Sequence, residues 1–309
     1  MSPGRQRMQR SGTEGSPTGP LGGGGARCAP CYIKHIISTL RIAGVEEEKQ
    51  YTLIHNLFST IAALDPLKSP AENSSLVLFE VYRLLGEDDP YKKARAASNE
   101  VARKYLPVLE RVVSASKDPL LTALKVSVAG NAIDMGINPD YDVGASIRRE
   151  LDRDFRRSDI DSFRELLSQG GPLVMIGDNS GEIVFDSLLM AQLRNYTGEL
   201  HYVVKGGPIL NDATIADAED AGMDFLAKVV TTGSNYLGTI PERSGQELCS
   251  LLASARIVLA KGQANYETLE GTTFAGEKTF FLLQAKCPVV AAHLEVDLGD
   301  SVLVRNKQL

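Results

Sequence analysis

Residues 172–186, PLVMIGDNSGEIVFD, form the stretch of sequence that decides the fold. The run LVMIG is continuously apolar, as is typical of a strand buried on both faces of a sheet, and the apolar spacing from Glu182 onward is that of a helix. Between the two stand Asp178 and Asn179, followed by a Ser-Gly turn. The stretch therefore predicts a strand, a turn and a helix, with a carboxylate and a carboxamide side by side at the exit of the strand.

The same alternation continues toward the C-terminus. Helical stretches alternate with short apolar runs, and we expect further strands at LHYVVKG, AKVVTTG and ARIVLAKG, with FFLL and SVLVR as additional candidates. Alternating strands and helices imply right-handed crossovers between parallel strands. We therefore expect residues 171–309 to form an α/β domain of the Rossmann-like kind, with a doubly wound, mainly parallel sheet.

The preceding part of the chain has a helical pattern nearly throughout. Apolar residues recur at three- and four-residue spacing in segments such as EKQYTLIHNLFSTIAAL and ENSSLVLFEVYRLLG, with Pro, Gly or Asp between segments. We expect an all-α helical domain over residues 28–170. Residues 1–27 are rich in Gly and Pro and carry several Arg but a lone Glu14, so we expect a disordered tail, with an organelle-targeting segment as the alternative.

Composition limits the classes of partner. The chain of 309 residues has a formal net charge of -6 and a pI near 5.4, which gives no general attraction to nucleic acid or to an anionic membrane. No apolar run reaches the roughly 18 to 20 residues of a membrane-spanning helix, and the N-terminus lacks the apolar core of a secretory signal. We expect a cytoplasmic protein with no nucleic-acid or membrane partner.

The cysteines raise the question of a second site. Four cysteines are too few for a disulfide scaffold in a chain of this length, in agreement with a reducing compartment. Cys28, Cys31 and His35 fall along one face of an expected helix, where two thiolates and an imidazole could converge on a soft metal. A zinc site needs a fourth ligand, and no second C-x-x-C exists. A thiol or metal site and reduced thiols packed at a helix start both stay open.

Polar residues follow each expected strand. In a doubly wound sheet, ligands bind beyond the carboxyl ends of the strands, so residues that follow different strands meet at one edge. We expect this edge to collect Asp178, Asn179, the NSGE turn with Ser180, Lys205, Asn211, Asp212, Thr231, Thr232, Asn235 and Lys261.

This set has the chemistry of a divalent cation and a phosphate. Asp178, Asn179 and Asp212 offer the oxygen ligands that Mg²⁺ or Mn²⁺ prefers, while Lys205, Lys261 and the backbone N–H groups of the NSGE turn could hold phosphoryl oxygens. A metal with open positions beside fixed cations is typical of displacement at phosphorus. The alternative for each acidic residue, taken singly, is ordinary helix capping or a solvated first turn. Because these residues are expected together at one edge of the sheet, we favour a metal and phosphate site over capping.

The same residues carry a resemblance to a known family. The blocks GDNSGEIVFD, KGGPILNDATIADAEDAG, LAKGQANYETL and AGNAIDMGI resemble the signature blocks of the metal-dependent damage-control phosphatases, long catalogued as domain of unknown function 89. The leading C-x-x-C resembles the branch found in archaea and other microbes. The resemblance covers residues 28–305 and keeps the family's order of blocks.

The resemblance implies a helical domain packed on a Rossmann-like domain with a metal between them. It also implies hydrolysis of small phosphate monoesters, sugar phosphates or damaged phosphometabolites, with Mn²⁺, Co²⁺, Ni²⁺ or Mg²⁺. Carried over residue by residue, the resemblance implies that the metal ligands are Asp178, Asn179 and Asp212. It implies that Glu182 is the acidic helix residue beside the site and that Lys261 contacts the phosphate. It also implies that Asn131 and Asp134 line the site from the helical domain. A lysine-containing Arg-Thr motif of a branch that acts on sugar phosphates has no counterpart near LLQAKCPVV.

We therefore expect a phosphatase in which the cation also binds a phosphoryl oxygen. Glu182, Asp186 or Asp217 would orient or deprotonate the attacking water, and Lys205 and Lys261 would neutralise developing charge. We expect Asn131, Asp134, Asn211 and Ser180 to face the substrate together with Lys205. The alternative within this class makes Asp178 a covalent nucleophile.

Two other classes stay as rival hypotheses. One is a Rossmann-type methyltransferase, although the turn lacks the G-x-G-x-x-G spacing and methyl transfer explains neither Asn179 nor Lys261. The other is a non-catalytic thiol- or metal-dependent interaction protein centred on Cys28, Cys31 and His35. The sequence does not indicate the physiological substrate, the preferred metal or the oligomeric state.

Overall fold

The computed structural model describes residues 25–130 and 143–307, and these contain one 7-stranded sheet in the order β1-β7-β6-β5-β2-β3-β4. Its strands are β1 (Arg157–Ser158), β2 (Leu173–Ile176), β3 (Leu200–Val204), β4 (Lys228–Thr231), β5 (Ile257–Lys261), β6 (Thr279–Gln284) and β7 (Ser301–Arg305). Neighbouring strands are parallel except for the antiparallel pair β6 and β7. The expected α/β class with a mainly parallel sheet is confirmed.

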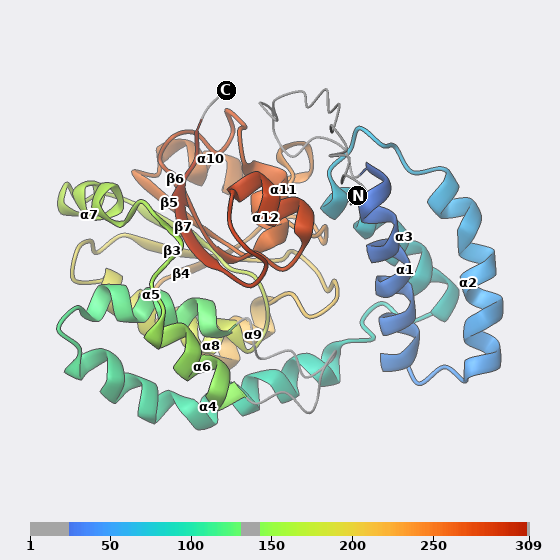
Figure 1. Ribbon diagram of the computed structural model, residues 1–309, viewed down its shortest axis with the longest axis horizontal. Helices are drawn as coiled ribbons and strands as arrows, with labels where there is room; N and C mark the ends of the chain where they lie inside the picture. The colour runs from blue at the N-terminus through green and yellow to red at the C-terminus, as the bar shows by residue number, and fades with distance from the viewer. Residues whose placement is uncertain (1–24, 131–142, 308–309) are drawn as a thin grey trace, which may run out of the picture.

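Helices cover both faces of this sheet, with α11 and α12 on one side and α4, α5 and α8 on the other (Figure 1). Successive residues of a strand point to opposite faces, so Leu173 and Met175 of β2 pack into one core cluster while Val174 and Ile176 pack into the other. The first cluster takes its helical residues from α4 (Lys92–Ala115), α5 (Pro119–Ala129), α6 (Val143–Asp152), α7 (Ile160–Ser168), α8 (Glu182–Leu193) and α9 (Ile215–Asp220). The second takes them from α10 (Gln246–Ser254), α11 (Gln263–Leu269) and α12 (Pro288–Leu294).

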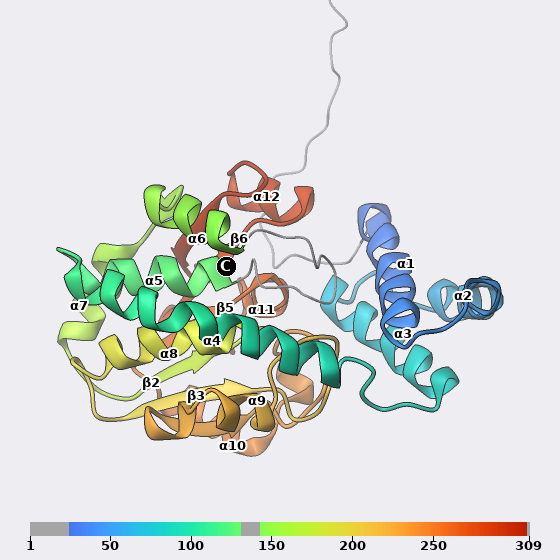
Figure 2. The same ribbon diagram turned by 90° about the horizontal axis from the view of Figure 1, so that it is seen from below.

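Three N-terminal helices pack at the side of the sheet. They are α1 (Gly25–Ile42), α2 (Glu47–Ala62) and α3 (Pro70–Leu85), and they share a third core cluster with Ile209 and Leu237 from loops that follow strands. Figure 2 shows α4 extending from the helical layer of the sheet toward this group. The expected boundary between two domains near residue 170 stays a prediction, and the helices before it divide between the N-terminal cluster and the sheet.

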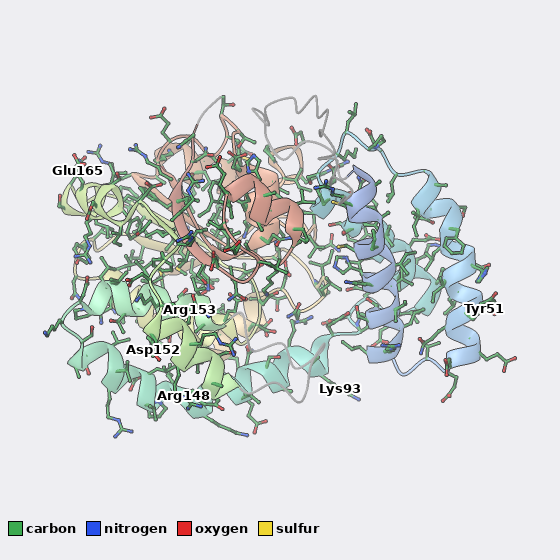
Figure 3. The ribbon with its side chains drawn as sticks, in the orientation of Figure 1. Tyr51, Lys93, Arg148, Asp152, Arg153 and Glu165 are labelled. Atoms are coloured by element: carbon green, nitrogen blue, oxygen red, sulfur yellow. The ribbon has the colours of Figure 1, made fainter. Side chains whose placement is uncertain are left out.

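The described part of the chain begins within the segment that was expected to be a disordered tail. Residues 25–27, expected in the tail, form the first turn of α1, and residues 1–24 lie outside the described part of the chain. The side chains of Tyr51 on α2 and Lys93 on α4 lie at the outer surface (Figure 3). None of the helices in the described ranges is long and apolar enough to cross a membrane.

The order of the strands reverses between β2 and β5, which are neighbours in the centre of the sheet. Chain segments leave this pair in opposite directions, so a crevice opens beyond its carboxyl end. Asp178 follows β2 and Gly262 follows β5 at this point. Gly262 has φ +82°, and a Cβ there would lie 1.9 Å from Oδ2 of Asp178. A side chain at position 262 would therefore occupy the place of the Asp178 carboxylate.

Candidate metal and phosphate site

Two loops that follow neighbouring strands lie side by side at the carboxyl edge of the sheet. The loop after β2 carries Asp178 and Asn179, and the loop after β3 carries Asn211 and Asp212. The Ser180 N–H donates to the Asn211 carbonyl at 2.8 Å, and an isolated antiparallel bridge joins Asn179 to Asp212. The backbone thus brings together the three residues that the sequence assigned to a metal.

The carboxamide of Asn179 is oriented by two carboxylates. Its Nδ2 donates to Oδ2 of Asp178 at 3.1 Å and to Oε1 of Glu182 at 2.8 Å. Because both amide protons are used in this way, Oδ1 remains available as an acceptor, the role that a metal ligand requires.

Two carboxyl groups at this edge, those of Asp178 and Asp212, have raised pKa values. The pKa of Asp178 lies well above its usual value because of burial, and the charges of Glu182 and Asp212 raise it further. Burial likewise raises the pKa of Asp212 to about 6, against the lowering effect of Lys205. Neighbouring carboxylates with little compensating positive charge favour the binding of a cation, because the cation stabilises their charged forms.

Asp212 keeps an oxygen without a hydrogen-bond donor. Its Oδ2 is buried, makes no hydrogen bond, and lies 3.5 Å from Nζ of Lys205. That ammonium also donates to the Gly238 carbonyl. Unsatisfied buried oxygens are uncommon in folded proteins, and a cation is one of the partners that satisfies them. Together with Asn179, this oxygen makes the donor set fit a hard divalent cation.

Carboxylates and thiols alone do not complete a metal site. Across residues 25–130 and 143–307, no group of three or more His, Cys, Asp and Glu side chains is placed to hold a metal ion. A three-ligand set at the edge therefore requires the carboxamide of Asn179. Cys28, Cys31 and His35 form no such group in these ranges, and the thiol or metal site that the sequence left open there stays a prediction. Burial lowers the pKa of His35 to about 4, so this imidazole is neutral.

A buried ionic cluster lies behind the edge. Lys261 is fully buried and donates to Oε2 of Glu182 at 3.0 Å, to Oδ1 of Asp186 at 2.7 Å and to the Ser127 carbonyl at 2.9 Å. Its three ammonium protons therefore have protein acceptors. Asp186 also accepts from Tyr202 Oη at 2.7 Å and from the Ser127 hydroxyl at 2.6 Å. Lys261 thus holds Glu182 in place, and the expected contact between Lys261 and phosphate stays a prediction.

Helix α4 contributes residues that the sequence did not single out. Asn99 is buried, accepts from the Gly181 N–H at 2.6 Å and donates to Oδ1 of Asp217 at 2.9 Å. Asp217 in turn caps α9 through Thr214 and pairs with Arg95 at 3.3 Å. Asp217 and Asp186 are therefore held by protein donors, and so is Glu182, whose donors are Asn179 and Lys261. Polar residues on the buried face of an amphipathic helix, as in ASNEV, are the signal that could have indicated Asn99.

A cavity of about 600 Å³ opens onto the edge. Seven residues expected at a site line it, namely Asp178, Asn179, Asn211, Asp212, Cys28, Cys31 and His35. Lys286 and Cys287, which the sequence did not indicate, also line it, and Lys286 lowers the pKa of Asp178 through its charge.

Several other expected site residues of the described ranges are not part of the lining of this cavity. Lys205 lines a separate cavity of about 650 Å³ beside α4 and α9. Ser180 is completely buried, and its hydroxyl makes no hydrogen bond in the structure. Thr232 is buried and accepts a hydrogen bond from the Gly206 N–H at 3.2 Å. Asn131 and Asp134 lie outside the described residues, so their expected contribution stays a prediction.

Comparison with known proteins gives consistent matches over nearly the whole chain. Residues 25–302 match the family model described as the damage-control phosphatase ARMT1-like domain. An uncharacterized protein of Methanocaldococcus jannaschii is 34% identical over 289 residues, which are 90% of this chain and 94% of that protein. A damage-control phosphatase of Archaeoglobus fulgidus is 39% identical over 72% of this chain and 77% of its own length.

A third relative has a solved structure. A damage-control phosphatase of Pyrococcus horikoshii is 34% identical over 77% of this chain and 82% of its own length. A crystal structure of a domain-of-unknown-function-89 protein of that organism superimposes with a TM-score of 0.83 at 29% identity. The superposition covers 91% of this chain and 98% of the crystallised chain.

Proposed function

This chain belongs to the damage-control phosphatase ARMT1-like family, and from this premise we propose that it hydrolyses small phosphate monoesters at a cation held by Asp178, Asn179 and Asp212. The family and the enzyme class expected from the sequence, a damage-control phosphatase and thus a phosphohydrolase, are confirmed by the same matches. Both rival hypotheses, the methyltransferase and the non-catalytic interaction protein, are set aside. The branch with a leading C-x-x-C stays a prediction.

One observation carries the proposed site. An oriented carboxamide, a carboxylate with an unsatisfied oxygen and a second carboxylate with a raised pKa meet on two neighbouring loops and open onto one cavity. The family suggests dependence on a divalent metal. Oxygen ligands suit Mn²⁺, Co²⁺, Ni²⁺ or Mg²⁺, and we propose a metal from this group.

The residues around the proposed cation have separate roles in hydrolysis. When bound, the cation supplies a Lewis acid that polarises the phosphoryl group. Asp178, Asn179 and Asp212 hold it, and Glu182 orients the attacking water and receives its proton. Glu182 suits this role because it contacts Asn179 directly. Protein donors occupy both oxygens of Glu182, as they do those of Asp186 and Asp217, so the contact with a proposed metal ligand is what distinguishes Glu182.

Three lysines act on the negative charge of the site. Lys261 positions Glu182 from behind through the 3.0 Å ion pair. Lys286 lines the cavity and exerts its charge on Asp178, so we assign it the attraction of the phosphate group. Lys205 pairs with Asp212 at 3.5 Å and limits the accumulation of negative charge at that ligand.

The volume of the cavity indicates the size of the substrate. Its volume of about 600 Å³ falls in the range of pockets that enclose a small organic molecule, larger than inorganic phosphate. We propose a small phosphate ester, such as a sugar phosphate or a damaged phosphometabolite, with no nucleic-acid or membrane partner. A cytoplasmic location is part of the proposal and is supported by the acidic composition and the few cysteines.

The test is a phosphate-release assay on a panel of small phosphate esters. The protein is first treated with EDTA, and each divalent metal is then added back to wild type and to Asp178→Ala. We expect release only with metal and only from wild type. Activity that is indifferent to EDTA, or that survives the substitution, would contradict the proposed site. Acid-quench trapping of a phosphorylated Asp178 would instead favour the covalent alternative.

A further inference from the structure

Three of the four cysteines line the cavity of the proposed site. Cys28 and Cys31 lie on the first turns of α1, and Cys287 lies at the start of α12. All three belong to the lining of the cavity of about 600 Å³ that also contains Asp178 and Asp212. Cys287 is separated from the other two by most of the length of the chain and reaches the cavity only through the fold. The fourth, Cys249 on α10, is outside this lining.

The thiols stand on two different parts of the core. Cys28 packs in the N-terminal cluster with Tyr32 and Ile36, whereas Cys287 packs against the cluster that includes α12 and the sheet. The cavity lies where these two parts face one another. A covalent bond between α1 and α12 would therefore join two walls of the cavity.

Burial and the charges of neighbouring thiols raise the pKa of two of these cysteines. Burial raises the pKa of Cys28 to about 11 and also raises the pKa of Cys31. Cys287 is the largest contributor to the rise at Cys31 after burial, and it contributes to the rise at Cys28 as well. All four cysteines are free in the structure. In the described part of the chain these thiols are not placed to share a metal ion. The chemistry considered for them is therefore the oxidation of free thiols.

We propose that Cys31 and Cys287 are a site of reversible oxidation, at which a disulfide joins α1 to α12 across the cavity. Cys31 is the partner on α1 because it is less buried than Cys28, whose side chain is only 8% exposed. The inference rests on the proposed function in one respect, since the expected consequence is a closed phosphatase site.

The reaction consumes a small disulfide as oxidant. The thiolate of one cysteine attacks a sulfur of the small disulfide, which forms a mixed disulfide and releases one thiolate. The second cysteine then attacks the protein sulfur and releases the other thiolate. The two protein thiols are oxidised, the small disulfide is reduced to two thiols, and the two protons lost by the protein are taken up by these products.

The experiment treats the full chain with oxidised glutathione and maps the disulfides with trypsin under non-reducing conditions. Residues 28–34, CAPCYIK, and residues 287–305, CPVVAAHLEVDLGDSVLVR, are separate tryptic peptides. We expect a cross-linked product of the two that dithiothreitol abolishes. It should form in Cys28→Ser and in the control Cys249→Ser, and it should be absent in Cys31→Ser and Cys287→Ser. A peptide 28–34 that is oxidised within itself, or no cross-link at all, would overturn the proposal.

Activity is the second readout, measured as the ratio of phosphate release after oxidation to release after reduction within each variant. We expect the ratio to fall for wild type and for Cys249→Ser, and to stay near one for Cys31→Ser and Cys287→Ser. A cross-link that forms without lowering the ratio would overturn the closure of the site. If the proposed function itself fails, no variant releases phosphate in either state, and the peptide map still decides whether the disulfide forms.

Discussion

Asn99 on α4 accepts a hydrogen bond of 2.6 Å from the backbone N–H of Gly181, which lies 82 positions further along the chain in the loop of the proposed metal ligands. The other end of the same side chain donates to Asp217, which caps α9 directly after the loop of Asp212. A single buried carboxamide therefore links the two loops that carry Asp178, Asn179 and Asp212. A helix outside the sheet thus adds a side-chain link to the backbone bridge that already joins these loops.

The first prediction concerns this link. Asn99→Asp keeps an acceptor for Gly181 but loses the donor to Asp217 and places two carboxylates against each other. We expect metal affinity to fall roughly 10- to 100-fold, the usual effect of losing a group that supports metal ligands. Calorimetric titration with Mn²⁺ measures it. The exposed Asn56→Asp on α2 makes the same chemical change and serves as control. An unchanged affinity in Asn99→Asp would show that α4 does not position the loops.

The second prediction concerns the carboxyl ends of the neighbouring strands β2 and β5. In Gly262→Ala the new Cβ would lie 1.9 Å from Oδ2 of Asp178, and φ at this position is +82°. We expect loss of metal binding and of phosphate release, because the carboxylate must move. Gly198→Ala is the control, since nothing lies within 4 Å of its added Cβ. Retained metal binding by Gly262→Ala would mean that Asp178 is not a ligand in its observed position.

The third prediction concerns the buried lysine. Lys261→Met removes the cation between Glu182 and Asp186 and leaves two buried carboxylates without it. Breaking one partner of a buried ion pair costs about 3–5 kcal/mol of unfolding free energy. Urea unfolding measures the loss, and Lys93→Met at the exposed start of α4 should change little. A loss as small as that of the control would contradict the proposed positioning role.

The fourth prediction concerns pH and a carboxyl away from the site. Burial raises the pKa of Glu270 from 4.5 to about 7, and its nearest basic group is His293, with Nε2 at 3.8 Å. A carboxyl whose pKa is higher in the folded state gives stability that is full below its unfolded pKa and lost as pH rises to the folded value. The unfolding free energy of wild type should therefore fall by on the order of 2 kcal/mol between about pH 4.5 and 7. That of Glu270→Gln should not show this fall.

Urea unfolding at several pH values checks this prediction for Glu270. The control is Glu277→Gln, because Glu277 is exposed. Parallel pH profiles for wild type and Glu270→Gln would exclude a raised pKa at this position.

The sequence predicts the parts of this molecule that depend on local pattern. The apolar runs gave β2 to β5 their places, and the Asp-Asn pair at the exit of β2 lies where parallel-strand geometry requires. Strand β1 was missed because it has 2 residues and no periodicity. The antiparallel direction of β7 also has no local signal, since it depends on the path of α12 between β6 and β7.

The site was only partly predictable for the same reason. Asp178, Asn179 and Asp212 follow strands directly, and a rule about strand ends finds them. Asn99, Lys286 and Cys287 reach the site from a distant helix and from a loop before a short helix, so only the tertiary fold brings them there. Lys261 is the last residue of β5, and its side chain points into the helical layer, where it pairs with Glu182 and Asp186.

The central claim is that Asp178, Asn179 and Asp212 hold a divalent cation, and Mn²⁺ binding followed by electron paramagnetic resonance tests it most directly. The account predicts a single Mn²⁺ site in wild type, a much weakened site in Asp212→Asn, and an unchanged site in Asp220→Asn, whose carboxylate pairs with Arg103 at the surface. Equal Mn²⁺ affinity in wild type and Asp212→Asn would contradict it.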